Sequence, residues 1–136
     1  MKTVWYPHGL AALSRGEINW ATSELRLAIL GPDYAPLAIH ENFSEVAWTE
    51  VTSPNYDVGG KVMTGRTLNV DSTGVDLNAS QVTWEESTIE GRYGVIYEAV
   101  SGSLVAYVDP ETPVFSIDGT FTVSWPNATL RLVVVP

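Results

Sequence analysis

Glutamates and aromatic residues crowd together between residues 82 and 110, in the stretch VTWEESTIEGRYGVIYEAVSGSLVAYVDP. Two carboxyl groups that face each other across a sugar can cleave a glycosidic bond, and nearby aromatic rings can stack on that sugar. Glu85 and Glu86 are adjacent, however, so on a β-strand their side chains point to opposite faces. Glu90 or Glu98 could converge with one of them, but nothing in the spacing requires it. We therefore interpret these glutamates as solvated strand and turn positions rather than as a catalytic pair.

The other residue types that carry chemistry are sparse. His8 and His40 lie far apart and lack a metal-binding spacing, and the chain contains no cysteine. Residues 71–76 loosely resemble a calcium-binding loop, but the alternating ligands and the closing glutamate are missing. No glycine-rich phosphate loop and no nucleophile motif occurs in the sequence. We predict a protein that is not an enzyme, without catalytic residues, bound metal or cofactor, in which residues 71–76 form a turn between strands.

The chain is acidic, and this limits the partners it can have. Its 136 residues carry a formal net charge of −9, with only seven lysines and arginines. Such a composition argues against a nucleic-acid partner, because binding to phosphates needs clustered cations. No stretch is apolar for long enough to span a membrane as a helix, and the first ten residues make a poor signal peptide. We expect a single domain, residues 1–136, that acts without nucleic acid or membrane.

Aromatic residues are the main candidates for an interaction surface. The sequence has five tryptophans and six tyrosines. Those that fall on predicted inner strand faces are best explained by core packing, and they are Trp84, Tyr93, Tyr97, Phe121 and Trp125. Trp5, Trp20 and Trp48 are less clearly placed, and we predict them as interface candidates. Arg92, Ile96 and Glu98 alternate with the inner residues of their strand, so we expect them to form an outward face that could also contact a partner.

The segments that carry these residues follow two hydrophobic periods. Residues 7–13 combine an N-terminal proline with helix-forming residues and are followed by Gly16, which predicts one short helix. From residue 25 onward, apolar residues recur at every second position in short runs that Gly, Pro and Asn separate, giving roughly seven to nine short strands. The pattern predicts a mainly β fold, an antiparallel β-sandwich or a jelly-roll-like barrel with one short N-terminal helix.

Several strands carry more specific predictions. Leu68 and Val70 are expected to point inward from a strand within residues 67–71. A strand ending at Trp84 is expected to lead into an acidic connection. Residues 93–99 and 104–109 alternate on either side of the tight-turn sequence Ser-Gly-Ser and predict a β-hairpin. The last expected strand has three inward side chains, which are Leu130, Leu132 and Val134.

Five of these segments occur in an order that resembles a known protein family. They are GLAALSRGEINWATSELRLAIL, YDVGGKVMTGRTL, VTWEESTIEGRYGVIYE, LVAYVD and GTFTVSW, and together they extend over roughly residues 7 to 125. In order and spacing they are similar to a family of small tailed-bacteriophage proteins encoded among virion structural genes. One shared feature is a tyrosine followed by a glycine pair, here Tyr56 with Gly59 and Gly60. The resemblance rests on the order of the motifs, since no single motif is specific.

The resemblance implies a structural component of a virion, assembled in the cytoplasm of the host bacterium. Within that class we expect a capsid decoration (cement) protein or a minor head protein on the outer capsid shell. Its partners would be the major capsid protein or other virion proteins, and further copies of itself. We expect a homo-oligomer, and a trimer in particular because capsid lattices offer three-fold sites. A neck or tail component, or a carbohydrate-binding adhesion module on the virion, is the alternative.

Overall fold

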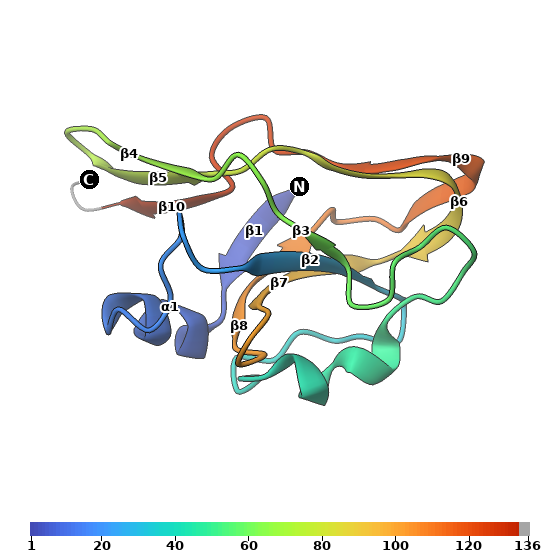
Figure 1. Ribbon diagram of the computed structural model, residues 1–136, viewed down its shortest axis with the longest axis horizontal. Helices are drawn as coiled ribbons and strands as arrows, with labels where there is room; N and C mark the ends of the chain where they lie inside the picture. Colours follow the sequence, from blue (N-terminus) through green and yellow to red (C-terminus); the bar gives the residue numbers. More distant parts are fainter. Residues whose placement is uncertain (134–136) are drawn as a thin grey trace.

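Two antiparallel layers form the fold in this computed structural model, which describes residues 1–133. The lower layer in Figure 1 is a five-stranded sheet, and the upper layer combines a three-stranded sheet with a two-stranded ribbon. The predicted fold class, a mainly β antiparallel sandwich with a short helix near the N-terminus, is therefore confirmed. The elements in chain order are β1 (Lys2–Trp5), α1 (Pro7–Ser14), β2 (Leu25–Leu30), η1 (Phe43–Glu45), η2 (Ala47–Thr49), β3 (Lys61–Val62), β4 (Thr67–Val70), β5 (Gly74–Asn78), β6 (Val82–Gly91), β7 (Tyr93–Glu98), β8 (Leu104–Asp109), β9 (Val114–Val123) and β10 (Leu130–Val133).

The lower layer has the strand order β1-β8-β7-β2-β3. Strands β7 and β8 form the predicted hairpin, and their turn contains Gly102 at a positive φ of 78°, a conformation that glycine adopts without steric cost. On the other side of β7, strand β2 pairs with it from Leu25↔Glu98 to Leu30↔Tyr93. This layer is the frame on which the other elements pack.

The upper layer consists of the sheet β10-β5-β4 and the ribbon β6-β9. The predicted end of a strand at Trp84 is wrong, because β6 continues through the acidic residues to Gly91. A bulge in β6 between Trp84 and Ser87 interrupts the β6–β9 ladder there, and a second register shift follows between Ser87 and Ile89, with Glu86 and Asp118 at positive φ (48° and 43°). The extra residue shifts the alternation, so Trp84 before the bulge and Ile89 after it both face the core.

The main core lies between the layers. Trp84 of β6 and Phe121 of β9 meet edge to face, with ring centroids 6.2 Å apart, and belong to one cluster with Leu27 of β2 and Ile96 of β7. Final-strand residue Leu130 is also buried in it. The predicted inward residue Val134 lies outside the described residues.

A second core covers the opposite face of the lower sheet. Tyr34 and Val46, from the segment between β2 and β3, pack with Leu30 of β2 and Val95 of β7. Both faces of β7 are therefore buried, and the prediction that Ile96 points outward is wrong. A strand covered on both faces is apolar throughout, so its alternation cannot show which side faces solvent.

Helix α1 packs against β8 of the lower sheet, which confirms the helix predicted for residues 7–13. Pro7 occupies its first turn, where a missing N–H costs no hydrogen bond. Gly9 forms the contact, because a Cβ at this position would lie 2.6 Å from the Leu104 carbonyl oxygen. In the described part of the chain, none of the helices has the length and apolar character that crossing a membrane requires.

Candidate interaction surfaces

The predicted interface tryptophans occupy three different environments. Trp20 is buried, and its indole Nε1 donates to the Asn78 carbonyl at 2.9 Å, so it offers no surface to a partner in this fold. Trp5 is half-buried on β1 and packs against the main core. Trp48 is 74% exposed. Of the three tryptophans, Trp48 alone presents most of its side chain to solvent.

Arg92 and Glu98 remain partly exposed but are engaged within the chain. The Arg92 guanidinium donates to the Asp109 carboxylate at 2.9 Å and lies over the Tyr93 ring, 4.2 Å from its centroid. The Glu98 carboxylate accepts hydrogen bonds from both the amide and the hydroxyl of Ser101, each at 2.6 Å. Arg92 therefore holds two strands of the lower sheet together, and Glu98 closes the β7–β8 turn.

The adjacent glutamates Glu85 and Glu86 lie at the β6 bulge, where both are exposed. The prediction that they point to opposite faces is wrong, because the positive φ of Glu86 breaks the alternation and both line one hollow beside Lys61. His40 uses Nδ1 to bond the Tyr34 hydroxyl at 3.1 Å. Within residues 1–133, no group of three or more histidine, aspartate and glutamate side chains is placed to hold a metal ion.

Strand β4 presents the first of two candidate surfaces. It is the outer strand of its sheet and carries Leu68 and Val70, which are 53% and 73% exposed. Leu68 pairs with the buried Leu77 of β5 and shares its sheet face, so the predicted inward direction is right. The predicted burial is not, because the β4–β5 hairpin projects past the strands of the lower sheet in Figure 1.

The backbone of β4 is also unpaired along its outer edge in the described structure. The Asp71 amide donates to the Gly74 carbonyl at 3.0 Å and closes the β4–β5 turn. The predicted turn between strands is present, but it is shorter than residues 71–76 because β5 begins at Gly74. Hydrogen-bonded pairs alternate along an antiparallel ladder, so the N–H and C=O groups of Leu68 and Val70 point away from β5. The sequence of β4, TLNV, contains neither charge nor proline, the features that commonly prevent edge pairing.

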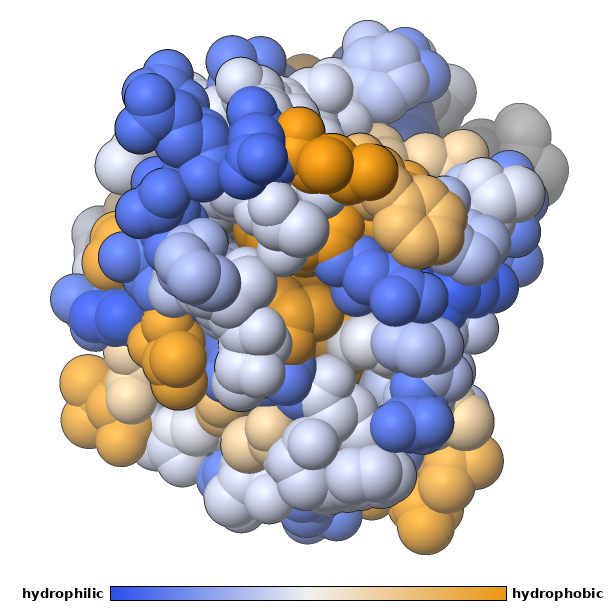
Figure 2. All heavy atoms as spheres, turned by 90° about the vertical axis from the view of Figure 1, so that its right-hand side faces the viewer, coloured by the Kyte–Doolittle hydropathy of each residue, from blue (hydrophilic) through white to orange (hydrophobic). Residues whose placement is uncertain are grey.

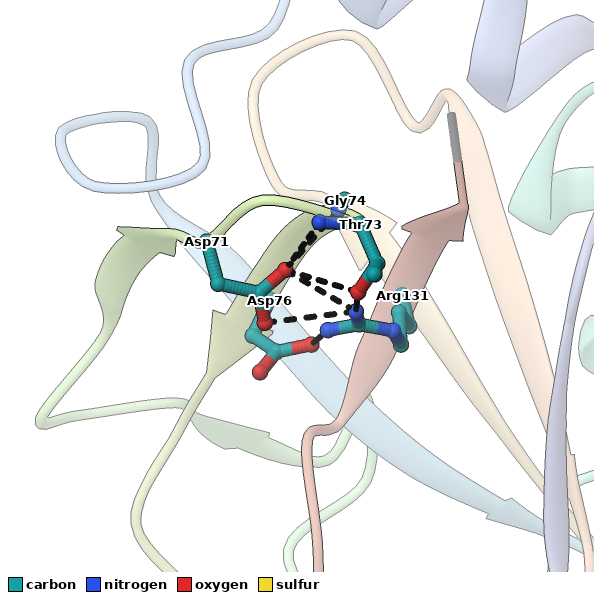
Figure 3. Close-up of polar contacts among 5 residues, drawn as sticks. All are labelled: Asp71, Thr73, Gly74, Asp76 and Arg131. Carbon is teal, nitrogen blue, oxygen red and sulfur yellow. Dashed lines mark hydrogen bonds and ion pairs between the residues drawn. The ribbon is translucent and has the colours of Figure 1, made fainter. Parts of the chain in front are cut away.

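A polar network fixes this hairpin on the opposite face of the sheet (Figure 3). Arg131 of β10 pairs with Asp76 of β5 and with Asp71 at the end of β4, with 3.2 Å between Arg131 Nη2 and Asp71 Oδ1. Asp71 Oδ1 also accepts from the Thr73 amide at 2.7 Å and the Gly74 amide at 2.9 Å. The Thr73 amide, followed by Arg131, holds the pKa of the Asp71 carboxyl far below its usual range. These contacts hold β4, β5 and β10 in a fixed register, so the free edge of β4 has a defined position.

A cleft of about 500 Å³ is the second candidate surface, and we call it the Trp48 cleft. Four segments line it, at residues 31–33, 48–53, 88–90 and 115–117. Trp48 reaches it because it lies in η2, which is a single 3-10 turn. Val46, the residue before η2, and Thr49, its last residue, are both buried, so the Trp48 side chain faces outward. Phe115 and Ile117 line the opposite side, on the outer face of β9.

Glu50 lines the Trp48 cleft and carries a half-buried carboxylate that bonds to residues outside the lining. Its Oε2 accepts from the Tyr56 hydroxyl at 2.6 Å and from the Gly59 amide at 2.7 Å, while Oε1 accepts no hydrogen bond from the described residues. Burial raises the pKa of the Glu50 carboxyl, and these two hydrogen bonds only partly oppose that rise. Asp33 and Glu90 line the same cleft. The lining therefore includes three acidic residues and no basic one from the described part of the chain.

Sequence reasoning misses three residues of this cleft. Phe115 and Ile117 alternate with Ser116 in the stretch VFSI, a signal that could have revealed a strand, but alternation alone would have placed the two apolar side chains inward. In the structure they are 61% and 80% exposed, and Ser116 faces the core. Glu50 lies in a segment whose alternation is weak, and the structure shows this segment to be irregular. The alternation was therefore too weak to place Glu50 in a site.

Comparison with known proteins adds no relative: no family model, no curated protein and no solved structure matches this chain. Function is therefore inferred from the two surfaces and from the order of the sequence motifs.

Proposed function

We propose that this chain is a structural component of a tailed-bacteriophage virion, a capsid decoration (cement) or minor head protein bound to the outer shell of the head. The order of five sequence segments, which resembles that of small virion structural proteins, supports this assignment. The partners are then the major capsid protein or neighbouring virion proteins, together with further copies of this chain. No catalytic role is part of the proposal.

The observation that carries the proposal is the uncovered edge of β4. The chain completes its core around large side chains such as Trp84, yet it leaves Leu68 and Val70 exposed on the apolar face of a projecting hairpin. Exposed apolar surface and a free strand edge are features that proteins use to associate with another chain. A protein that assembles with other chains needs such a surface, whereas in a monomeric protein an exposed strand edge promotes aggregation.

The net charge supports a place on the outside of the capsid. A net charge of −9 would repel the packaged DNA on the inner face of the shell. On the outer face the same charge favours solubility and leaves short-range apolar contacts to hold the protein in place.

Counting copies in purified virions tests the proposal directly. Quantitative mass spectrometry against the major capsid protein should find this chain in a number of copies comparable to the number of lattice positions on the shell. A handful of copies per particle would instead favour a neck or tail component. Absence of the chain from mature particles would refute a virion role.

One observation favours a second candidate, a carbohydrate-binding adhesion module. Trp48 is exposed beside carboxylates, and an aromatic ring with polar neighbours can stack on a sugar. Binding on a glycan array that is lost in Trp48→Ala would support this function. Absence of binding, or binding that survives the substitution, would remove Trp48 as the platform.

A further inference from the structure

The Trp48 cleft combines apolar surface with a concave shape. Trp48, Phe115 and Ile117 lie around it, and each exposes more than half of its surface. Figure 2 shows the end of the molecule to which these segments belong, with apolar groups set among polar ones around a hollow near the centre of the view. A volume of about 500 Å³ is in the range of clefts that bind small ligands or a few side chains.

The charge of the cleft defines the chemistry of its occupant. Asp33, Glu50 and Glu90 line it, whereas no lysine, arginine or histidine among residues 1–133 does. None of the three carboxylates takes part in an ion pair of the described structure. Glu50 is held in place by Tyr56 and Gly59 and keeps Oε1 free for a further donor. A half-buried carboxylate without a counter-charge gains most from a cationic partner.

Other classes of occupant fit this chemistry less well. Nucleic acid and anionic lipid headgroups would be repelled by the three carboxylates. A neutral glycan could stack on Trp48 but would leave the negative charge uncompensated. A basic side chain can satisfy both features at once, because it pairs with Glu50 and its cation is attracted to the face of an indole ring.

We propose that the Trp48 cleft binds a segment of a partner protein in which a lysine or arginine is flanked by apolar residues. The cation pairs with Glu50 and lies near Trp48, and the flanking apolar side chains contact Phe115 and Ile117. The identification of the partner as a virion protein rests on the proposed function. The expected chemistry of the bound segment does not depend on it.

A short peptide is the probe that tests this site. Acetyl-Val-Arg-Phe-Arg-Val-amide, titrated into the isotopically labelled protein at low salt, should shift the Trp48 indole resonance and bind with a Kd on the order of 0.1 to 1 mM. Binding should weaken as salt is raised, because the contact is partly electrostatic. The same peptide with glutamine in place of both arginines should bind at least about ten-fold more weakly.

Two substitutions and a matched control locate the contact. Glu50→Gln keeps an oxygen that accepts from Tyr56 and Gly59, so the fold should be retained while the Kd rises about ten-fold. Trp48→Ala should raise the Kd about five-fold. Glu85→Gln removes the same charge from a different hollow and should leave the Kd within about two-fold of the wild type. A thermal melt of each variant shows whether it is folded.

Several results would overturn the proposal. Equal losses of affinity in Glu50→Gln and Glu85→Gln would show that only overall charge matters. A glutamine peptide that binds as tightly as the arginine peptide would remove the cation from the interaction. Shifts at Trp48 with chitohexaose or cellohexaose, and none with the arginine peptide, would assign the cleft to glycans. If the chain binds the peptide but is absent from virions, the proposed binding site stands and the proposed virion role is refuted. The two proposals can therefore fail separately.

Discussion

Self-association through β4 can be tested with a single added charge. The alternation of hydrogen bonds directs the N–H and C=O groups of Leu68 and Val70 outward. Two copies can therefore pair their β4 strands antiparallel about Asn69, with Leu68 of each copy opposite Val70 of the other. This register keeps the apolar face of both sheets on one side and extends each three-stranded sheet into one of six strands. A dimer of this kind is two-fold symmetric, whereas the expected trimer needs a different contact.

The strength of this pairing follows from its contacts. Four backbone hydrogen bonds contribute about 1 kcal/mol each. Partial burial of four apolar side chains adds about 0.5 to 1 kcal/mol each, because they are only partly exposed at the start. Against this gross gain of roughly 7 kcal/mol, association costs at least about 4 kcal/mol. The net gain is therefore at most about 3 kcal/mol, which corresponds to a Kd of about 6 mM or weaker in solution. Such a contact becomes effective when neighbours are fixed side by side on a shell, where the local concentration is millimolar.

Val70→Lys is the informative variant, because edge lysines are a common natural barrier to strand pairing. In the wild type, the amide resonances of residues 68–70 should begin to shift as the protein concentration approaches about 1 mM, because the expected Kd is only a few times higher. In Val70→Lys these shifts should disappear, while the melting temperature stays nearly constant because the native side chain is mostly exposed. Thr67→Lys adds the same charge on the polar face of β4 and should retain the concentration dependence. If both variants associate equally, or the wild type shows no shifts in this segment, the β4 contact is refuted.

Three further predictions concern the scaffold. Gly9→Ala should destabilise the fold by about 2 kcal/mol in a thermal or denaturant melt, since the clash of its Cβ with β8 outweighs the better helix propensity of alanine. Tyr6→Phe should cost about 1 kcal/mol by removing the buried hydroxyl contact with Tyr34. Because burial raises the pKa of Tyr6 well above its usual value, Tyr6→Phe should remove no tyrosine that ionises near pH 10 from the ultraviolet titration of the folded protein. Asp71 has a folded pKa below the ordinary 3.8, so the stability it contributes is present above pH 3.8 and is lost as the pH falls through the folded pKa. The gap in melting temperature between wild type and Asp71→Asn should therefore narrow on acidification below pH 4, and a gap that widens would contradict this role for Asp71 and Arg131.

The direction of a strand's side chains can be predicted from the sequence where one face is apolar and that face lies in the core, but not where both faces are buried. The helix at residues 7–13 and the β7–β8 hairpin could be predicted because proline, glycine and alternation mark them clearly. The outward direction of Ile96 could not be judged correctly, because Val95 and Ile96 are both apolar and both buried. The cover over Val95 comes from residues 31–50, an irregular segment without a hydrophobic period.

The irregular backbone at Glu86 explains why the predicted directions of the Glu85 and Glu86 side chains are wrong. Alternation assumes an unbroken strand, and it gives the right face for Val82 and Trp84. At Glu86 the backbone adopts a positive φ, which a sequence pattern does not mark unless glycine or asparagine stands there. The bulge that places two exposed glutamates in succession therefore had no signal in the sequence.

The two candidate surfaces share a physical origin that links the fold to its proposed role. Leu68 and Val70 belong to the β4–β5 hairpin, and Phe115 and Ile117 belong to the ribbon β6–β9. The hairpin and the far end of the ribbon lie at opposite ends of the upper layer in Figure 1. Leu68 and Val70 are exposed because the lower sheet does not extend far enough to cover the inner face of β4. Phe115 and Ile117 are exposed because they lie on the outer face of β9. The two proposed contacts therefore place a copy of the chain at one end and a different partner at the other. Because different strands carry the two surfaces, Val70→Lys and Trp48→Ala should have additive and separable effects on assembly.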